Sequence, residues 1–337
     1  MKVLILKPRL DLPFKKFSAA MSDPNLPEIR TYWDKFCTEL KVAHEKKNDT
    51  VFIVEAPRWQ FANDIVKEYN ADVTYVPHTE KERFHGQHLM KPATIYHGCM
   101  YYMQTVFPEL FTIDPVGWGG GASFAKTIPE YVSRKDDDIF KQYQERIKNN
   151  ESKFDQPKTN IRKIEYHHDD FIFVPLQLPH DETIKYHSKL GVCEFVRSLC
   201  EWSLESDVPI VFKGHPVNLP SMEPLKEIIE ASSARVSYVD DVSIHAVIPK
   251  CTAVYLINSG VGMEAMLHEK PVVSFGKSEY QHFVIKGDIK DLSATWADAL
   301  HESTNKDALL ENYKKFFNWY VGTICYNCNN INYFRLP

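Results

Sequence analysis

The stretch that decides the fold is AVYLINSGVGMEAMLHEKPVVSFG, which spans residues 253–276. It contains two apolar runs of strand length, 253–258 and 271–276, on either side of a helical stretch at 261–269. Strands that alternate with helices are typical of a parallel sheet with helices on both faces. We therefore expect an α/β fold.

The same alternation extends over most of the chain. In the second half the pattern predicts further strands at 171–177, 209–216 and 235–241, and helices at 183–205, 221–232, 243–250 and 291–322. In the first half it predicts strands at 1–7, 50–56, 72–78 and 93–98, and helices at 28–48 and 61–71. We predict two Rossmann-like lobes that face a cleft, followed by a helical tail.

A highly charged segment separates the two halves. Residues 133–170 hold nine basic and nine acidic side chains, which is almost half of the segment. Because little of it can form a core, it is interpreted as a solvated helix and a linker. The predicted domains are an N-terminal lobe at 1–132, the linker at 133–170, a C-terminal lobe at 171–290, and a tail at 291–337 that packs back on the first lobe.

Length and composition exclude several classes of protein. The 337 residues are enough for two domains of about 150 residues each. The formal charge of −5 argues against a nucleic-acid binder, and 44% apolar residues exclude global disorder. No apolar run approaches the ~20 residues that cross a bilayer, and the apolar stretch in MKVLILKPRL is too short for a signal peptide. We expect a cytoplasmic protein.

The seven cysteines are scattered and odd in number, which favours reduced thiols. Cys325 and Cys328 have CxxC spacing, but a closed zinc site needs four ligands and the sequence has no second such pair. The acidic run at 136–138 is explained by the composition of the charged segment. We predict neither a metal site nor a resident cofactor.

Polar side chains follow three of the predicted strands, and ligands of open α/β sheets bind beyond such strand ends. At the first strand end, Asn258 is followed by Ser259 and Gly260, which open a helix whose N–H groups and dipole suit a phosphate. Glu264, one turn further on, is placed to accept hydrogen bonds from ribose hydroxyls. Taken alone, this segment is better explained as an ordinary turn between a strand and a helix.

The second strand end is KGHP, at residues 213–216. Lys213 ends the strand and Pro216 holds His215 in the loop, so two potential cations lie beside the same edge of the sheet. A lysine acts as a point charge on phosphate, and a histidine can donate a hydrogen bond to it. This motif and the serine-bearing turn are together much more specific than either alone.

The third strand end is PLQLPHDETIKYHS, at residues 175–188. It adds Gln177 to the candidate donor-binding residues, and His180 and Asp181 to the candidate catalytic residues. Asp181 is also a suitable helix N-cap. From composition alone, the functional and the capping interpretations are equally open.

The glycine-rich loop of the first half is FPELFTIDPVGWGGGAS, at residues 107–123. Its acidic residues, Glu109 and Asp114, lie near Trp118 and three consecutive glycines, but it lacks the Lys-Ser/Thr of a P-loop. A mobile acceptor-binding loop with an aromatic platform and a structural turn both remain open.

Four segments occur in an order and spacing known from one family: FVPLQLPHDETIKYHS, VFKGHPVN, YVDDVSIHAVIPKC and VYLINSGVGMEAMLHEKPVVSFGKSEY. Over about residues 171–285 the chain thereby resembles the bacterial capsule polysaccharide biosynthesis proteins, the Kdo transferases of capsule assembly with GT-B-type folds. The resemblance implies transfer of Kdo, or a similar acidic sugar, from a CMP-activated donor. The acceptor would be a glycan or glycolipid held by the N-terminal lobe.

The resemblance also implies roles for single residues. The His215-Pro216 and Ser259 motifs would bind the nucleotide phosphate, without a metal. Asp181 would act at the anomeric carbon, with retention of configuration if its carboxylate attacks directly. His180 and Glu109 are the rival catalytic groups.

Two other functions stay open. A CDP-glycerol-type glycerophosphotransferase resembles GT-B enzymes and also uses a His-Pro element and a serine-bearing turn. A non-enzymatic module that binds a nucleotide or a lipid-linked glycan is the third candidate.

Membrane contact is a separate question. The segment YKKFFNWYVG, at 313–322, combines basic and aromatic residues, which suits the cytoplasmic face of a membrane. A C-terminal helix that packs back on the first lobe is the favoured alternative.

Overall fold

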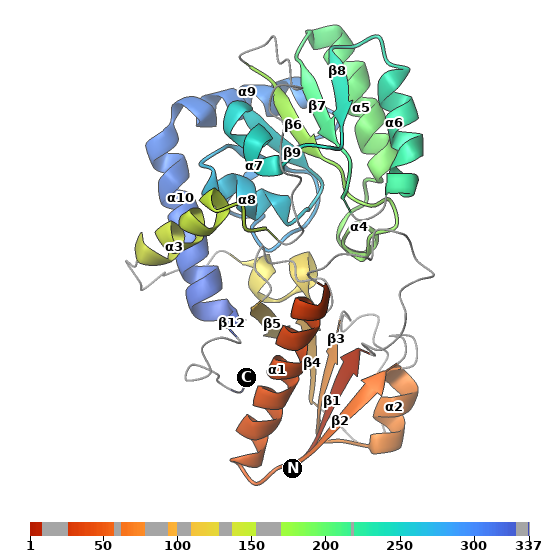
Figure 1. Cartoon of the computed structure of the whole chain (residues 1–337), viewed down its shortest axis with the longest axis vertical. Coiled ribbons are helices and arrows are strands. Elements are labelled where there is room, and N and C mark those ends of the chain that lie inside the picture. The colour runs from red at the N-terminus through yellow and green to blue at the C-terminus, as the bar shows by residue number, and fades with distance from the viewer. Residues whose placement is uncertain are drawn as a thin grey trace. The chain divides into compact units, whose positions relative to one another are not determined.

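The computed structural model describes residues 1–8, 26–56, 62–77, 94–99, 109–127, 137–152, 170–216, 219–327 and 336. The chain divides into two units (Figure 1). Unit 1 holds the described residues before 129 and after 319, and unit 2 holds those from 137 to 319. Each contains a six-stranded sheet and helices, which confirms the predicted α/β class.

All six strands of unit 2 are parallel. They are β6 (Ile172–Pro175), β7 (Ile210–Lys213), β8 (Val236–Val239), β9 (Ala253–Leu256), β10 (Val272–Ser274) and β11 (Ile285–Lys286). Across the sheet they follow the order β8-β7-β6-β9-β10-β11. This is the 3-2-1-4-5-6 order of doubly wound folds, whose ligands bind where the order reverses, here between β6 and β9.

The helices of unit 2 are α3 (Asp137–Lys148), α4 (Glu182–His187), α5 (Val192–Ser206), α6 (Glu223–Glu230), α7 (Ile244–Val247), α8 (Val261–Leu267), α9 (Leu292–Thr304) and α10 (Lys306–Trp319). The single helix predicted at 183–205 is two helices, α4 and α5. Ser188 is extended, and its hydroxyl bonds to both the N–H and the carbonyl of Leu190. Such local bonds compete with the helical ones and end α4.

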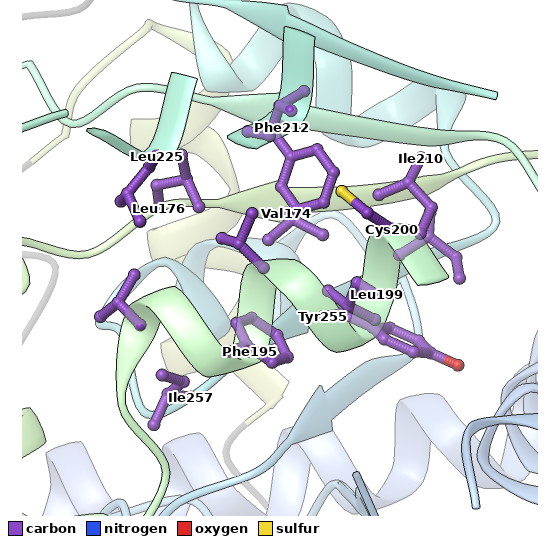
Figure 2. Close-up of a cluster of buried hydrophobic side chains, with 14 of the residues drawn as sticks. Val174, Leu176, Phe195, Leu199, Cys200, Ile210, Phe212, Leu225, Tyr255 and Ile257 are labelled. Carbon is purple, nitrogen blue, oxygen red and sulfur yellow. The ribbon is translucent and has the colours of Figure 1, made fainter. Parts of the chain in front are cut away.

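The main core of unit 2 lies between the sheet and α5, α6 and α9. Figure 2 shows Val174, Phe212 and Tyr255 of the strands beside Phe195 and Leu199 of α5. Burying side chains of this size stabilises the fold by about 1.5–3 kcal/mol each. Because side chains alternate along a strand, the intervening strand residues face the other side, where α8 packs on β9 and β10.

The helix within the charged segment is a packed element of unit 2. Phe140 and Tyr143 of α3 contact the ring of Phe317 in α10. Gln144 Nε2 donates at 3.0 Å to the carbonyl of Leu267, at the end of α8. The segment at 133–170 was interpreted as a solvated helix and linker, and its described part differs because one face of α3 is apolar and buried.

Unit 1 has a mixed sheet, with the order β2-β1-β3-β4-β5-β12. The strands β1 (Lys2–Pro8), β2 (Thr50–Ala56), β3 (Val73–Pro77) and β4 (Thr94–Cys99) are parallel, as predicted. The strands β5 (Leu110–Asp114) and β12 (Tyr326–Asn327) are antiparallel to their neighbours and were not predicted. Of the two helices, α1 (Leu26–Glu45) and α2 (Ala62–Tyr69), α1 stacks Phe36 on Phe111 of β5 at 4.5 Å.

The predicted tail is shared between the two units. Its helices α9 and α10 pack in unit 2, where the Tyr313 hydroxyl donates to the carbonyl of Lys270 at 2.9 Å. The residues after 319 belong to unit 1, to which they contribute β12. The aromatic side chains of the tail are buried: Tyr313, Phe316, Phe317, Trp319 and Tyr320. In the structure these rings therefore do not form an exposed lipid-binding face.

None of the described helices has the length and apolarity needed to span a membrane.

Candidate functional site

Two amide side chains bridge the point where the strand order of unit 2 reverses. Gln177 follows β6, Asn258 follows β9, and both are buried. Gln177 Nε2 donates to Asn258 Oδ1, and the Asn258 N–H donates to Gln177 Oε1, each at 3.0 Å. Asn258 Nδ2 donates to the Thr183 carbonyl at 2.9 Å, which ties α4 to the same point. Two predicted strand ends thus meet at this edge.

A buried cation lies on the neighbouring strand. Lys213 ends β7, where its carbonyl accepts the N–H of Leu176 at 2.9 Å, and it is only 2% exposed. Burial lowers the pKa of the Lys213 ammonium to about 8, and the charges of Asp240 and Glu264 oppose this shift. The group is therefore mostly protonated at neutral pH.

The backbone after Lys213 fits closely under β8. A Cβ on Gly214 would lie 2.2 Å from the Tyr238 hydroxyl oxygen, so a larger residue would require either the Tyr238 side chain or this loop to move. His215 is half-buried and Pro216 is exposed. The predicted pair of cations, Lys213 and His215, therefore lies at one strand end.

The serine-bearing turn joins β9 to α8. Ser259 Oγ accepts the N–H of Val261 at 3.3 Å, and Gly260 precedes the helix. Tyr280 is fully buried and donates its hydroxyl to the Ser259 carbonyl. A Cβ on Gly262 would lie 2.6 Å from the hydroxyl oxygen and Cζ of Tyr280. Tyr280 therefore holds the turn, and glycine at 262 makes room for its ring.

A buried polar cluster surrounds Glu264 in α8. The Ser152 hydroxyl donates to Glu264 Oε1, and His245 Nε2 lies 3.9 Å from the same oxygen. His245 Nδ1 and His268 Nε2 are 3.0 Å apart. Burial lowers the pKa of each imidazole to about 4. At neutral pH both rings are uncharged, so the charge within this cluster is that of Glu264.

The edge lies within a recognisable family region. The family model described as capsule polysaccharide biosynthesis protein matches residues 121–314, more than half of the chain. The chain belongs to that family. The match takes in all three strand ends of unit 2 and α3, whereas most of unit 1 lies outside it. No curated protein matches this member of the family.

Several solved structures resemble this capsule biosynthesis family member. The Thermosulfurimonas dismutans KpsC β-Kdo 2,7-transferase is 16% identical, with a TM-score of 0.46 over 91% of this chain and 100% of that one. The β-Kdo 2,4-transferase of the same KpsC is 14% identical, with a TM-score of 0.46 over 72% and 77%. A Methanocaldococcus jannaschii UDP-GlcNAc 2-epimerase is 12% identical, with a TM-score of 0.38 over 92% and 98%.

The third strand end places Asp181 as a helix cap. Its Oδ1 accepts the N–H of Thr183 at 2.9 Å and the Thr183 hydroxyl at 3.0 Å. The carboxylate is partly exposed, and His180 beside it is exposed in the turn before α4. The structure therefore confirms that Asp181 caps α4. A catalytic role for Asp181 or His180 stays a prediction.

The glycine-rich segment of unit 1 is a tightly bonded turn. Asp114 Oδ1 accepts the N–H groups of Val116, Gly117 and Ser123 at 2.8, 3.0 and 3.0 Å. Trp118 is 1% exposed, so it offers no exposed aromatic platform. Glu109 is buried just before β5. Its catalytic role is likewise a prediction that the structure of unit 1 alone does not test.

Among the described residues, no group of three or more histidine, cysteine, aspartate or glutamate side chains could hold a metal ion. Cys325 is half-buried, and Cys328 lies outside the described residues.

Sequence reasoning missed several residues at the edge, namely Ser152, Thr183, His245, His268 and Tyr280. Four of them, Thr183, His245, His268 and Tyr280, lie within the family segments quoted above, which was the available signal for them. Ser152 lies in the charged segment, where composition gives no signal.

Proposed function

We propose that the protein is a glycosyltransferase. It transfers Kdo or a Kdo-like acidic sugar from a CMP-activated donor to a glycan or glycolipid acceptor at the cytoplasmic face of the membrane. The observation that carries the proposal is the convergence of Lys213, Ser259 and Glu264 around the Gln177–Asn258 bridge, where a doubly wound sheet binds ligands. Membership of a capsule polysaccharide biosynthesis family supports the surface-glycan context.

In this proposal each group of the edge has one task. Lys213 and His215 stabilise the negative charge that develops on the CMP phosphate as the bond between the phosphate and the sugar breaks. Such electrostatic stabilisation of the leaving group is usually the largest contribution to catalysis. Ser259 supplies a hydroxyl to the same phosphate, and Glu264 accepts hydrogen bonds from the ribose. Gln177 and Asn258 hold the two strand ends in register. No resident cofactor takes part.

The sugar would react beside α4. Departure of CMP leaves an oxocarbenium-like centre, which a carboxylate can stabilise or attack. Asp181 is the proposed carboxylate, because its partly exposed side chain lies on the α4 turn that Asn258 ties to the nucleotide edge. If Asp181 attacks directly, a covalent glycosyl-enzyme forms as CMP leaves, and the acceptor hydroxyl then displaces the carboxylate, so that configuration is retained overall. His180 and Glu109 are the alternatives for this role.

Product formation tests the proposal directly. The full-length protein is incubated with CMP-Kdo, other CMP-activated acidic sugars or CDP-glycerol, together with glycolipid acceptors, and products are sought by mass spectrometry. Transfer of an acidic sugar with release of CMP is expected. Transfer of glycerol phosphate from CDP-glycerol alone would identify a glycerophosphotransferase instead. Thermal stabilisation by CMP without any product would favour a binding module.

A further inference from the structure

Three consecutive residues after α3, 150–152, lie against the helices α7 and α8. The Ser243 hydroxyl, which caps α7, donates to Asn150 Oδ1 at 3.1 Å. The backbone of Glu151 lies close enough to the His245 imidazole to raise its pKa, against the larger effect of burial. The Ser152 hydroxyl donates to the Glu264 carboxylate. Asn150 has a φ of 63°, a left-handed conformation that asparagine tolerates better than most residues. The chain therefore turns sharply after α3 and runs along the starts of α7 and α8.

The carboxylate that this segment reaches needs hydrogen-bond donors. Glu264 is 3% exposed, and a buried carboxylate is costly unless donors and opposite charge surround it. The nearest imidazole, His245, is uncharged at neutral pH, and Lys213 supplies opposite charge from β7. Ser152 supplies a hydroxyl to one carboxylate oxygen. Since an ionised carboxylate has about four acceptor positions, a hydroxyl donor such as Ser152 can fix its orientation without occupying all of them.

We infer that Ser152 is a positioning residue, which orients Glu264 so that its carboxylate accepts the ribose hydroxyls of a cytidine nucleotide. This inference rests on the proposed function, in which Glu264 contacts the ribose. It deepens that function by making the site selective for ribonucleotides over their deoxy analogues. It also gives the described end of the charged segment, 150–152, a task at the site.

The helix α3, which precedes Ser152, offers a matched control. Gln144 of α3 donates to the Leu267 carbonyl and to Glu269 Oε1, each at 3.0 Å. These bonds fasten α3 to the far end of α8 and do not involve Glu264. Gln144→Ala therefore loosens α3 while leaving the Ser152–Glu264 bond in place.

The test compares CMP with 2′,3′-dideoxy-CMP by isothermal titration calorimetry. For the full-length wild-type chain we expect CMP to bind at least about tenfold more tightly, the effect of one charge-assisted hydrogen bond. Ser152→Ala should reduce this preference about three- to tenfold, mainly by weakening CMP. Ser152→Thr, which keeps the hydroxyl, and Gln144→Ala should retain it. Glu264→Gln shows how much of the preference for CMP over 2′,3′-dideoxy-CMP is lost when the carboxylate is removed.

Each remaining outcome overturns a defined step. An unchanged preference in Ser152→Ala, or an equal loss in Gln144→Ala, would show that Ser152 only fastens the segment. Equal affinity of the wild type for both ligands would refute the contact between Glu264 and the ribose, and therefore the inference. It would not contradict the proposed phosphate site. No CMP binding at all would instead refute the proposed function itself. If Ser152→Ala does not fold, loss of the preference in Ser152→Thr decides against the inference.

Discussion

The titration of Lys213 predicts how nucleotide affinity depends on pH. Its pKa of about 8 means that the ammonium is about 90% protonated near pH 7 and about 10% protonated near pH 9. A bound phosphate stabilises the protonated form and raises its pKa, so binding above pH 8 requires uptake of a proton. The Kd for CMP should therefore rise about tenfold between pH 7 and pH 9, which corresponds to about 1.4 kcal/mol.

Calorimetry in buffers of different ionisation enthalpy measures this dependence and counts the protons taken up. The CMP phosphate is fully ionised across the window, because its second pKa is about 6. Lys213→Met provides the control, with weak affinity that does not change between these pH values. A wild-type Kd that stays constant from pH 7 to pH 9 would refute the contact between Lys213 and the phosphate.

The lowered pKa of Lys213 makes stability and CMP affinity depend on pH in opposite directions. The folded pKa of Lys213 lies below the ordinary lysine value of 10.5, so the unfolded chain binds more protons between about pH 8 and 10.5. Burial of the ammonium thus costs stability in full below about pH 8, and that cost is relieved as the pH rises through this window. The shift corresponds to about 3 kcal/mol. The urea midpoint should therefore rise between about pH 8 and 10.5 more in the wild type than in Lys213→Met, whose side chain does not titrate.

Three substitutions test the other parts of the edge. His215→Ala should lower kcat/KM for the CMP-sugar at least about tenfold without lowering the unfolding midpoint, because it removes a charge-assisted contact from a half-buried loop; unchanged kinetics would contradict the assignment. Asp181→Asn keeps an oxygen for the Thr183 N–H, so it should abolish transfer while CMP affinity and stability change little; retained activity would leave Asp181 as a cap alone. Gly262→Ala places a methyl 2.6 Å from Tyr280 ring atoms and should destabilise by about 1–3 kcal/mol in urea unfolding; a wild-type midpoint would show that the ring can move.

The parts of the fold that the sequence predicted are those set by local apolar pattern. Strands such as β7 and β9 are buried on both faces, so they appear as continuous apolar runs bounded by polar strand ends. The strand ends in turn predicted which side chains would gather at one edge, because parallel strands finish on the same side of a sheet. The bridge from Gln177 to Asn258 follows from that rule, although its hydrogen bonds do not.

The missed features depend on contacts between distant parts of the chain. Ser152 meets Glu264 across 112 residues, and nothing in the local composition of the charged segment marks it. The strand β12 has only two residues, too few for any periodicity, and exists because β5 offers it an edge. The composition of the aromatic tail left a lipid interface open beside the favoured packed helix, and only the contacts of its buried rings distinguish the two. The position of Trp118 shows the same limit, since the sequence did not indicate that its ring is buried.

The short strand β12 has a consequence for how the protein is made. It is built from residues 326–327, whereas the strand it completes, β5, ends at residue 114. A ribosome that adds about 5–20 residues per second needs on the order of 10–40 s to synthesise the 212 residues from 115 to 326. During that time the edge of β5 on which β12 later pairs lacks that strand, and an uncovered edge is prone to pair with other nascent chains. The amino-terminal sheet is thus begun first and finished last, so a chaperone that covers β5 during translation would raise the yield of folded protein.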